Sequence, residues 1–329
     1  MNDSNTIKVS VIVPFYRVAP YIARCARSLM EQTLQDVEFI FVDDASPDDS
    51  AKLLKEVLSL YNREVTILVH DVNKGLPAAR NTGLAVARGE YIWHCDSDDY
   101  PEPTMLEELY VAAMENDADL AYCDFYLDFG TGRRCMSHPC YSDGEQLVKE
   151  GFLAGRAKYN VWNKIAKRSL YKGISFPDGH PMGEDMTMIL LATRACKVAY
   201  VPKPLYHYMK TNSGAFTNTV SDRHRADILF NTQRTIDFLK MWPVEDLERY
   251  LAFFQLDVKL PFLFTGHYAD YWLWHQWFPE ANAYIGQNPH LPRRTVWVQQ
   301  WAAWHLFPLV WLYCMAVNTF YYRRLNKTA

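Results

Sequence analysis

The stretch Glu90-Tyr91-Ile92-Trp93-His94-Cys95-Asp96-Ser97-Asp98-Asp99-Tyr100 decides how the first half of this chain is interpreted. It begins as an apolar run suited to a buried strand and ends in Asp-Ser-Asp-Asp. Carboxylates crowded beside apolar packing repel one another unless hydrogen-bond donors or a cation compensate, and a hard divalent metal ion is one such compensator. A solvated acidic turn before a helix near Pro103 is the alternative.

Strand-like and helix-like segments alternate through the first hundred residues. Apolar, β-branched runs at 8–14, 37–42 and 65–69 precede the run that ends at Asp96. Helices are expected between them, at 21–32, 50–60 and 77–87. This alternation predicts βαβ units and an α/β fold, in which helices flank a mainly parallel, Rossmann-like sheet.

Three loops should meet at one edge of this sheet, because ligands of open parallel sheets bind beyond the carboxyl ends of the strands. The loops begin at Pro14, at Asp43 and at Asp96. The sequence has no GxGxxG after the first strand and no GxxxxGK[ST], so it lacks both a dinucleotide fingerprint and a P-loop. A metal ion and scattered basic residues would have to neutralise any bound phosphate.

Composition narrows the function classes and the compartment. A net charge of -4 argues against a general nucleic-acid binder, and no nucleic-acid partner is expected. The first six residues are polar and form no signal segment, which argues against export. Seven scattered cysteines without a CxxC pair indicate reduced thiols. We therefore expect a cytoplasmic protein.

Four motifs resemble, in order and spacing, the successive signatures of family 2 glycosyltransferases, which are inverting enzymes of the GT-A fold. They are Val9–Tyr16, Val42–Asp48, Asn73–Gly75 with Ala79–Gly83, and Gly89–Tyr91 with Asp96–Asp99. A weaker resemblance continues through Val161–Arg168, Gly183–Asp185 and Pro204–Thr217. It implies a GT-A domain over 1–218, with a nucleotide-sugar half at 1–128 and an acceptor and catalytic-base half at 129–218.

The resemblance implies a metal site that holds the donor diphosphate. Asp98, helped by Asp96, would bind Mn²⁺ or Mg²⁺, since carboxylate oxygens suit both ions. His207 lies at a position that sometimes contacts metal or phosphate in the family, although a histidine between two tyrosines also suits a packed core.

The resemblance also implies a nucleotide site built around Asp43 and Asp44. These carboxylates would accept hydrogen bonds from the base and ribose, and a uracil N–H favours a UDP-sugar donor. Because Asp-Ala-Ser-Pro-Asp is also turn and N-cap chemistry, one of the pair is expected to bind nucleotide and the other to order the loop.

Five further residues complete the predicted donor site. They are Pro14 and Tyr16 from the first loop, Lys74 and Arg80 near the phosphates, and Lys210. Arg80 is equally suited to be a surface charge on its helix. Lys210 stands where an arginine is common in the family, so a bidentate phosphate clamp is in doubt there.

Asp185 is the expected general base. By the resemblance, it would take a proton from an acceptor hydroxyl during attack opposite the leaving group, which inverts the anomeric carbon. Burial beside the acidic Glu184 should raise the pKa of Asp185 toward that task. The alternative is an acidic first turn of the following helix.

Residues 219–329 are predicted as a helical, aromatic-rich extension. No Asp, Glu, Lys or Arg occurs between Arg294 and Arg323, while tryptophans recur at helical spacing and Pro308 interrupts them. A helix or broken helix at about 293–325 lying in the membrane interface is favoured over a spanning helix or a packed core or oligomer element. This predicts peripheral attachment to the inner face of the cell membrane.

The leading functional interpretation is a metal-dependent inverting glycosyltransferase. It would move sugar from a nucleotide-diphosphate sugar to a hydroxyl of a glycan or lipid-linked saccharide, in synthesis of a surface polysaccharide such as lipopolysaccharide or capsule. One alternative is a Mg²⁺-dependent phosphohydrolase or phosphotransferase, although Pro14-Phe15-Tyr16 stands where its aspartyl nucleophile motif belongs. Another is a catalytically silent, membrane-attached glycan-binding module.

Overall fold

A computed structural model describes residues 7–212 and 221–325. The chain forms two compact units: unit 1 contains Met1–Val148 and Tyr159–Trp242, and unit 2 contains Lys149–Lys158 and Pro243–Ala329. Helix α7 (Asp222–Leu239), which is predicted as part of the C-terminal extension, groups with unit 1.

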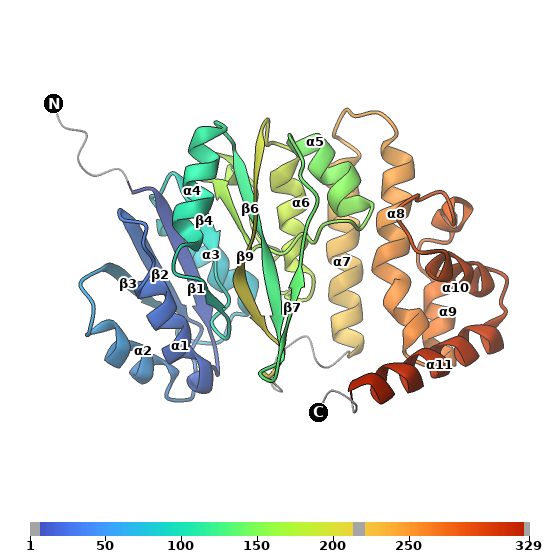
Figure 1. Ribbon diagram of the computed structural model, residues 1–329, viewed down its shortest axis with the longest axis horizontal. Helices are drawn as coiled ribbons and strands as arrows, with labels where there is room; N and C mark the ends of the chain where they lie inside the picture. Colours follow the sequence, from blue (N-terminus) through green and yellow to red (C-terminus); the bar gives the residue numbers. More distant parts are fainter. Residues whose placement is uncertain (1–6, 213–220, 326–329) are drawn as a thin grey trace. The chain divides into compact units, whose positions relative to one another are not determined.

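The first half of the unit 1 sheet is parallel, as predicted. Strands β1 (Val9–Phe15), β2 (Val37–Asp43), β3 (Glu64–Val69) and β4 (Tyr91–His94) lie in the order β3-β2-β1-β4, and all three pairings are parallel. Figure 1 shows these strands side by side in the blue-to-cyan part of the chain. Their carboxyl ends therefore share one edge of the sheet.

The second half of the sheet is mixed. Strand β8 (Lys164–Lys167) runs antiparallel to both β4 and β6 (Leu120–Asp128). Strand β6 pairs in parallel with the long β9 (Val198–Met209), which in turn pairs antiparallel with β5 (Tyr100–Pro101). An antiparallel β7 (Arg133–Met136) lies on β6.

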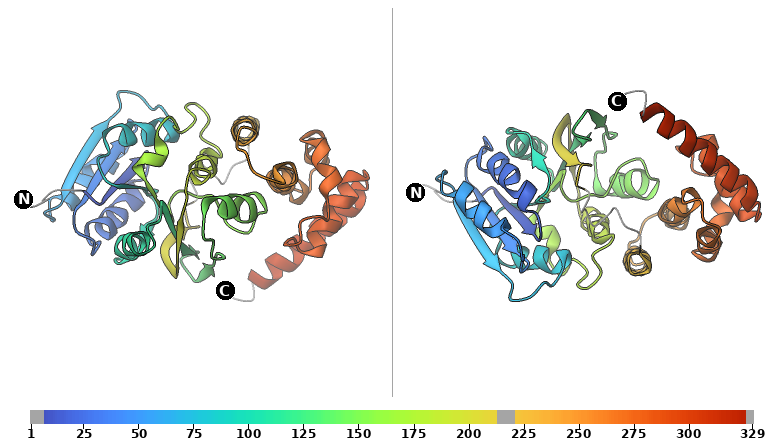
Figure 2. Two further views of the ribbon diagram at one scale, coloured as in Figure 1. Left: turned by 90° about the horizontal axis from the view of Figure 1, so that it is seen from above. Right: turned by 90° about the horizontal axis from the view of Figure 1, so that it is seen from below.

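Helices cover both faces of the sheet, which Figure 2 shows from two sides. Helices α1 (Ala19–Met30), α2 (Ser50–Leu58) and α4 (Met105–Glu115) share a core with the alternate residues Val9, Val11, Val13 and Phe15 of β1. Helix α3 (Leu76–Val86) packs on the other face, where a Cβ at Gly83 would lie only 2.5 Å from Ile12 Cγ2. This close approach brings Arg80, the basic residue of α3, toward the edge of the sheet.

Short helical segments occupy the rest of unit 1. They are α5 (Gly144–Gln146), the 3-10 helices η2 (Arg168–Tyr171) and η3 (Glu184–Met186), and α6 (Thr187–Ala192). The π-helix η1 (Leu147–Leu153) begins in unit 1, and its residues from Lys149 onward belong to unit 2. Gly183 precedes η3 with φ of 86°, a left-handed conformation that costs glycine little. Gly183 therefore allows the chain to turn directly into the acidic η3 segment.

Unit 2 is helical and aromatic-rich, as predicted. It contains α8 (Leu247–Lys259), η5 (Leu260–Phe264), α9 (Tyr268–Gln276), η6 (Pro279–Tyr284), α10 (Arg293–Ala303) and α11 (Phe307–Leu325). The fully buried Lys259 donates to the carbonyl oxygens of Trp277 (2.8 Å) and Phe278 (3.1 Å) after α9. Among the described residues, no helix has both the length and the apolarity needed to cross a membrane.

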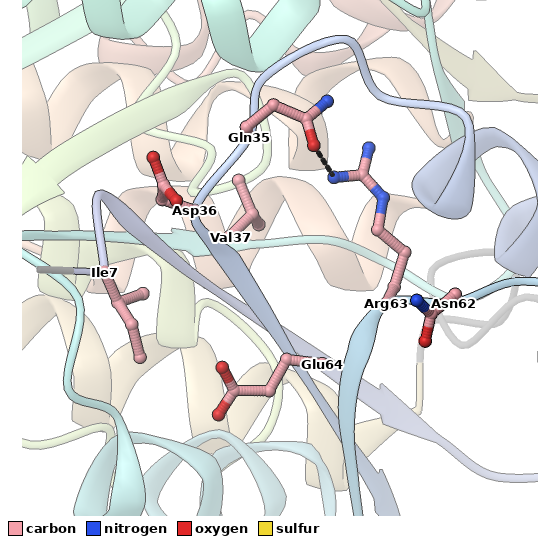
Figure 3. Close-up of a pocket in the computed structure, with 7 residues that line it drawn as sticks. All are labelled: Ile7, Gln35, Asp36, Val37, Asn62, Arg63 and Glu64. Carbon is pink, nitrogen blue, oxygen red and sulfur yellow. Dashed lines mark hydrogen bonds between the residues drawn. The ribbon is translucent and has the colours of Figure 1, made fainter. Parts of the chain in front are cut away.

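A small hollow lies at the amino-terminal ends of β2 and β3, away from the acidic loops. Figure 3 shows its lining, in which Arg63 points toward Gln35. The Arg63 guanidinium donates to the carbonyl oxygens of Met30 (3.2 Å) and Leu34 (3.1 Å) and to that of Gln32 at the end of α1. Arg63 thus closes a helix terminus, which is a structural role.

Candidate active site

The carboxyl ends of β1, β2 and β4 bring the predicted loops together. Phe15 is in register with Asp43, and the Asp44 amide donates to the Phe15 carbonyl (3.1 Å). On the other side of β1, the Cys95 amide donates to the Ile12 carbonyl (3.0 Å). Backbone pairing therefore fixes both acidic loops at the same edge of the sheet.

Arg80 of α3 connects two of the predicted acidic groups. Its Nη2 lies 2.8 Å from Asp96 Oδ1 and 3.5 Å from Glu184 Oε1, and its side chain is 1% exposed. Arg80 is therefore no surface charge, which rules out that alternative. Its Nε and Nη1 have no hydrogen-bond partner among residues 7–212 and 221–325, so donors remain for a ligand, and its contact with nucleotide stays a prediction.

Asp185 lies in the electrostatic environment that a general base needs. Burial, together with the nearby Asp96 carboxylate, raises its pKa to about 6, although Arg80 and Lys164 oppose the rise. Its Oδ1 is buried and accepts no hydrogen bond within the described part of the chain. Such a carboxylate is largely ionised at neutral pH yet basic enough to accept a proton.

Glu184 and Lys164 flank this carboxylate. Burial and the adjacent Asp185 raise the pKa of Glu184 well above its usual value. Burial lowers the pKa of Lys164 to about 7, and its Nζ donates to Asn163 Oδ1 (2.7 Å) and to the Asn160 carbonyl (2.8 Å). Lys164 is the first residue of β8, and no local pattern in Lys164–Lys167 indicates its place beside Asp185.

The three aspartates after β4 differ in their surroundings. Asp99 is fully buried, and its carboxylate accepts from the Tyr206 hydroxyl (3.0 Å) and the Met209 amide (2.7 Å). Asp98 Oδ2 accepts from Asn212 Nδ2 (2.8 Å), while burial and the Asp96 charge raise the Asp98 pKa. Asp99 thus ties the loop to β9, and the Asp96 and Asp98 carboxylates are the ones suited to a ligand.

His207 lies in a packed environment. Its Nε2 is 2.7 Å from Glu102 Oε1, its Nδ1 is 3.7 Å from Asp128 Oδ2, and its ring stacks on Tyr100. No group of three metal-ligating side chains forms within the described ranges. These contacts favour the packed-histidine alternative over the predicted metal ligand, because both ring nitrogens already face other carboxylates.

Asp43 and Asp44 divide their contacts unequally. Asp44 accepts from the Lys74 and Gly75 amides (both 2.8 Å), and its Oδ1 lies 2.7 Å from His70 Nδ1. Asp43 uses Oδ1 to accept from the Ser46 amide (2.8 Å). The contacts assign loop ordering to Asp44, which leaves Asp43 as the better candidate for nucleotide.

This division makes a testable prediction about two neighbouring aspartates. Asp44→Ala should lower the free energy of unfolding by about 2–4 kcal/mol, since it leaves the buried His70 ring and two part-buried amide donors without their carboxylate partner. Asp43→Ala should change stability by less than about 1 kcal/mol and instead weaken nucleotide binding. Urea unfolding and calorimetric titration with UDP measure the two effects. Equal destabilisation with unchanged binding in both variants would contradict the division.

The remaining predicted donor-site residues lie at or near this edge. Pro14 is buried in β1 and in register with Val42, and Tyr16 follows it with an exposed ring. Lys74 has an exposed side chain. Lys210 follows β9 and places Nζ 4.4 Å from the Tyr208 ring centroid. Their roles toward a donor stay predictions.

Sequence reasoning missed three partners of the Asp96–Asp99 loop. Arg24 Nη2 donates to the Asp98 carbonyl (2.9 Å), Asn212 donates to the Asp98 carboxylate, and the Tyr206 hydroxyl accepts from the Asp96 amide (3.3 Å). Each comes from an element distant in sequence. No local pattern could have indicated these contacts.

Proteins of similar sequence are named as glycosyltransferases. The chain is 34% identical over 211 residues to the uncharacterized glycosyltransferase EpsJ of Bacillus subtilis, an alignment that covers 61% of this chain and 60% of EpsJ. It therefore spans about three fifths of that relative's length.

Solved structures share the fold at lower identity. S. aureus TarS 1-349 in complex with UDP-GlcNAc superposes with a TM-score of 0.67 and 18% identity, covering 92% of this chain and 90% of the TarS chain. The mannosyltransferase PcManGT from Pyrobaculum calidifontis, in complex with GDP-Man and Mn²⁺, gives a TM-score of 0.55 and 16% identity, with coverage of 96% and 88%. The sheet and its flanking helices are thus GT-A-like.

The model of the family described as "Glycosyl transferase family 2" matches residues 10–187. This range runs from the second residue of β1 past the end of η3 and hence includes Asp43, Arg80, Asp96, Asp98 and Asp185. Since the match covers more than half of the 329 residues, the chain belongs to glycosyl transferase family 2.

Proposed function

We propose that this glycosyltransferase is a metal-dependent, inverting enzyme that transfers sugar from a UDP-sugar to a hydroxyl of a glycan or lipid-linked saccharide. We further propose that it acts at the inner face of the cell membrane, in synthesis of a surface polysaccharide such as lipopolysaccharide or capsule. The observation that carries the proposal is Arg80, which joins Asp96 and Glu184–Asp185 at the carboxyl edge of the sheet. Family membership weighs against both the phosphohydrolase and the silent-module alternatives.

The Asp96 and Asp98 carboxylates fit a divalent cation. Burial and mutual repulsion disfavour ionisation of Asp98, and a bound cation would remove that penalty. Oxygen ligands suit Mg²⁺ and Mn²⁺, and the donor diphosphate and water would complete the coordination. When bound, the ion supplies Lewis-acid stabilisation of the leaving diphosphate. The neighbour PcManGT is named with Mn²⁺, which supports the same choice.

Two observations support uridine as the base of the donor. Asp43 accepts from the Ser46 amide with Oδ1, and its second carboxylate oxygen can accept a hydrogen bond from a uracil N–H. TarS, which shares the fold, is named in complex with UDP-GlcNAc, whereas PcManGT is named with GDP-Man. Because guanine also presents N–H donors to a carboxylate, we choose UDP on the TarS complex, whose TM-score of 0.67 exceeds the 0.55 of PcManGT.

Asp185 performs the proton transfer in this proposal. The acceptor oxygen forms a bond to the anomeric carbon as the bond from that carbon to the diphosphate oxygen breaks, and the electron pair leaves with the diphosphate. Asp185 Oδ1, which accepts no hydrogen bond in residues 7–212 and 221–325, takes the hydroxyl proton. Attack from the side opposite the leaving group inverts the anomeric configuration.

The donor-site proposal is tested by nucleotide binding. UDP should bind wild-type protein in the presence of Mn²⁺ or Mg²⁺, and both EDTA and Asp98→Asn should weaken binding by at least about 100-fold, since EDTA removes the cation that would hold the diphosphate and Asp98→Asn removes a carboxylate ligand of that cation. Isothermal titration calorimetry measures the affinity for UDP, and the affinity for GDP is measured in the same way for comparison.

Asp117→Asn is the matched control for that experiment. This carboxylate is 80% exposed and pairs with Lys197 on the surface, so its loss should leave the UDP affinity unchanged. UDP affinity that persists at full strength in EDTA, or in Asp98→Asn, would refute the metal assignment. Tighter binding of GDP would refute the uridine assignment alone.

A further inference from the structure

The last helix of unit 2 is apolar on the side that faces away from its own core. Phe307, Val310 and Cys314 are buried at helical spacing. The opposite side carries Pro308, Leu309, Leu312, Met315 and Ala316, which are all exposed and which we call the outer face. A helix that is apolar all round is normally buried in a protein or a membrane.

Exposed tryptophans also lie on the neighbouring helices of unit 2. Trp297 of α10 is 57% exposed, and Trp304, at the break between α10 and α11, is 63% exposed. Trp272 of α9 is 50% exposed, with its ring centroid 5.1 Å from that of Phe307. Trp is enriched where one side of a protein meets lipid headgroups.

The charge pattern identifies the surface that this face would meet. From Ala281 to Ala329 the sequence contains no Asp or Glu, while arginine pairs stand at 293–294 and 323–324. An anionic lipid surface carries charge complementary to these arginines, and the segment has no acidic side chain that would be repelled by it. Most contiguous exposed apolar surfaces of this kind are interaction sites.

A break in the chain separates α10 from α11. His305 has φ of 57°, and Pro308 lies in the first turn of α11, so the predicted segment at 293–325 is two helices rather than one. Neither meets the requirements for spanning a membrane, within the described residues. A surface helix with its apolar side in the headgroup region needs no such length.

We propose that the outer face of α11, with the neighbouring tryptophans, docks unit 2 on an anionic lipid surface. This inference rests on the peripheral location in the proposed function and is independent of the donor chemistry, which lies in unit 1. The lipid surface would hold the enzyme where a lipid-linked acceptor is concentrated.

Vesicle flotation tests the docking surface on the full chain. Wild-type protein should float with vesicles of phosphatidylcholine and phosphatidylglycerol and much less with phosphatidylcholine alone. Leu312→Glu with Met315→Glu should reduce the partition coefficient at least about tenfold, because each change places a charge in the apolar contact. Leu60→Glu with Met241→Glu is the matched control, since both residues are exposed apolar side chains of unit 1.

The outcomes separate this inference from the donor-site proposal. UDP affinity, measured in parallel, should be equal in all variants and shows that unit 1 is folded. Lack of flotation in wild type, or equal flotation in the outer-face variant, would overturn the docking surface whatever the UDP result. A dimer that the outer-face variant dissociates, without vesicle binding, would assign the face to a second copy and likewise overturn it.

Discussion

Asp185→Asn should reduce the turnover rate by about 10²–10⁴-fold while it leaves UDP affinity nearly unchanged. The amide preserves the shape of the side chain but cannot take the acceptor proton at Oδ1, which is buried and has no hydrogen-bond partner within the described residues. UDP release during turnover and calorimetric UDP binding measure the two quantities. Their separation is expected because a general base acts on the acceptor and not on the nucleotide.

The pH dependence provides a second readout of the same residue. A base must be deprotonated, so wild-type kcat/KM should rise as pH increases through about 6, the pKa to which burial brings Asp185, and level off above it. Because Glu184 interacts with Asp185, the observed value belongs to the pair. Asp237→Asn, a change at an exposed aspartate of α7, should retain the wild-type rate and profile. Asp185→Asn activity within tenfold of wild type would exclude the base role.

The sequence predicted the parallel half of the fold closely because its signals are local. Each of the first four strands is a short β-branched or aromatic run, three of them end at a proline or an acidic cluster, and each intervening helix shows a helical spacing of apolar residues. The predicted helix at 77–87 is observed at Leu76–Val86, for example. The rule for carboxyl ends then placed Asp43 and Asp96 at one edge without any knowledge of the structure.

The second half of the sheet could not be predicted because its order depends on long-range pairing. Strand β6 pairs with β8 and β9, and β9 contains Pro202 and Pro204 and shifts register beside Asp124. The strands that pair with β9 determine which of its side chains reach the Asp96–Asp99 loop. Tyr206 and His207 illustrate the consequence. These adjacent residues contact Asp99 and Glu102 respectively, whereas the sequence singled out only the histidine as a candidate site residue, with a packed histidine as the alternative.

The role of Arg80 in the site likewise depends on long-range contacts that the sequence does not reveal. As sequence, it is a basic residue on a helix, suited to a surface or to a phosphate. The structure gives it a third role as the central cation between Asp96 and Glu184, because Gly83 brings α3 close against β1 and places the guanidinium inside the edge of the sheet.

Arg80→Met should therefore destabilise the fold by about 3–5 kcal/mol, since it leaves the buried Glu184 and the part-buried Asp96 without their counter-charge. The comparison is Lys203→Met, which breaks an ion pair of equal N···O distance, 2.8 Å, between Lys203 and Glu108. Lys203 is 61% exposed, so solvent screens that pair and its loss should cost less than about 1 kcal/mol. Urea unfolding of both variants measures the difference.

A double variant distinguishes lost charge compensation from lost packing. If uncompensated charge is the cause, Arg80→Met with Glu184→Gln should be more stable than Arg80→Met alone, because one of the stranded carboxylates is then neutral. If the cost came from the contact between the guanidinium and the Phe176 ring, which lie 5.6 Å apart, the second change would add its own destabilisation instead. The sign of the coupling free energy decides between these causes, and with it whether the acidic edge of the sheet is held together by charge.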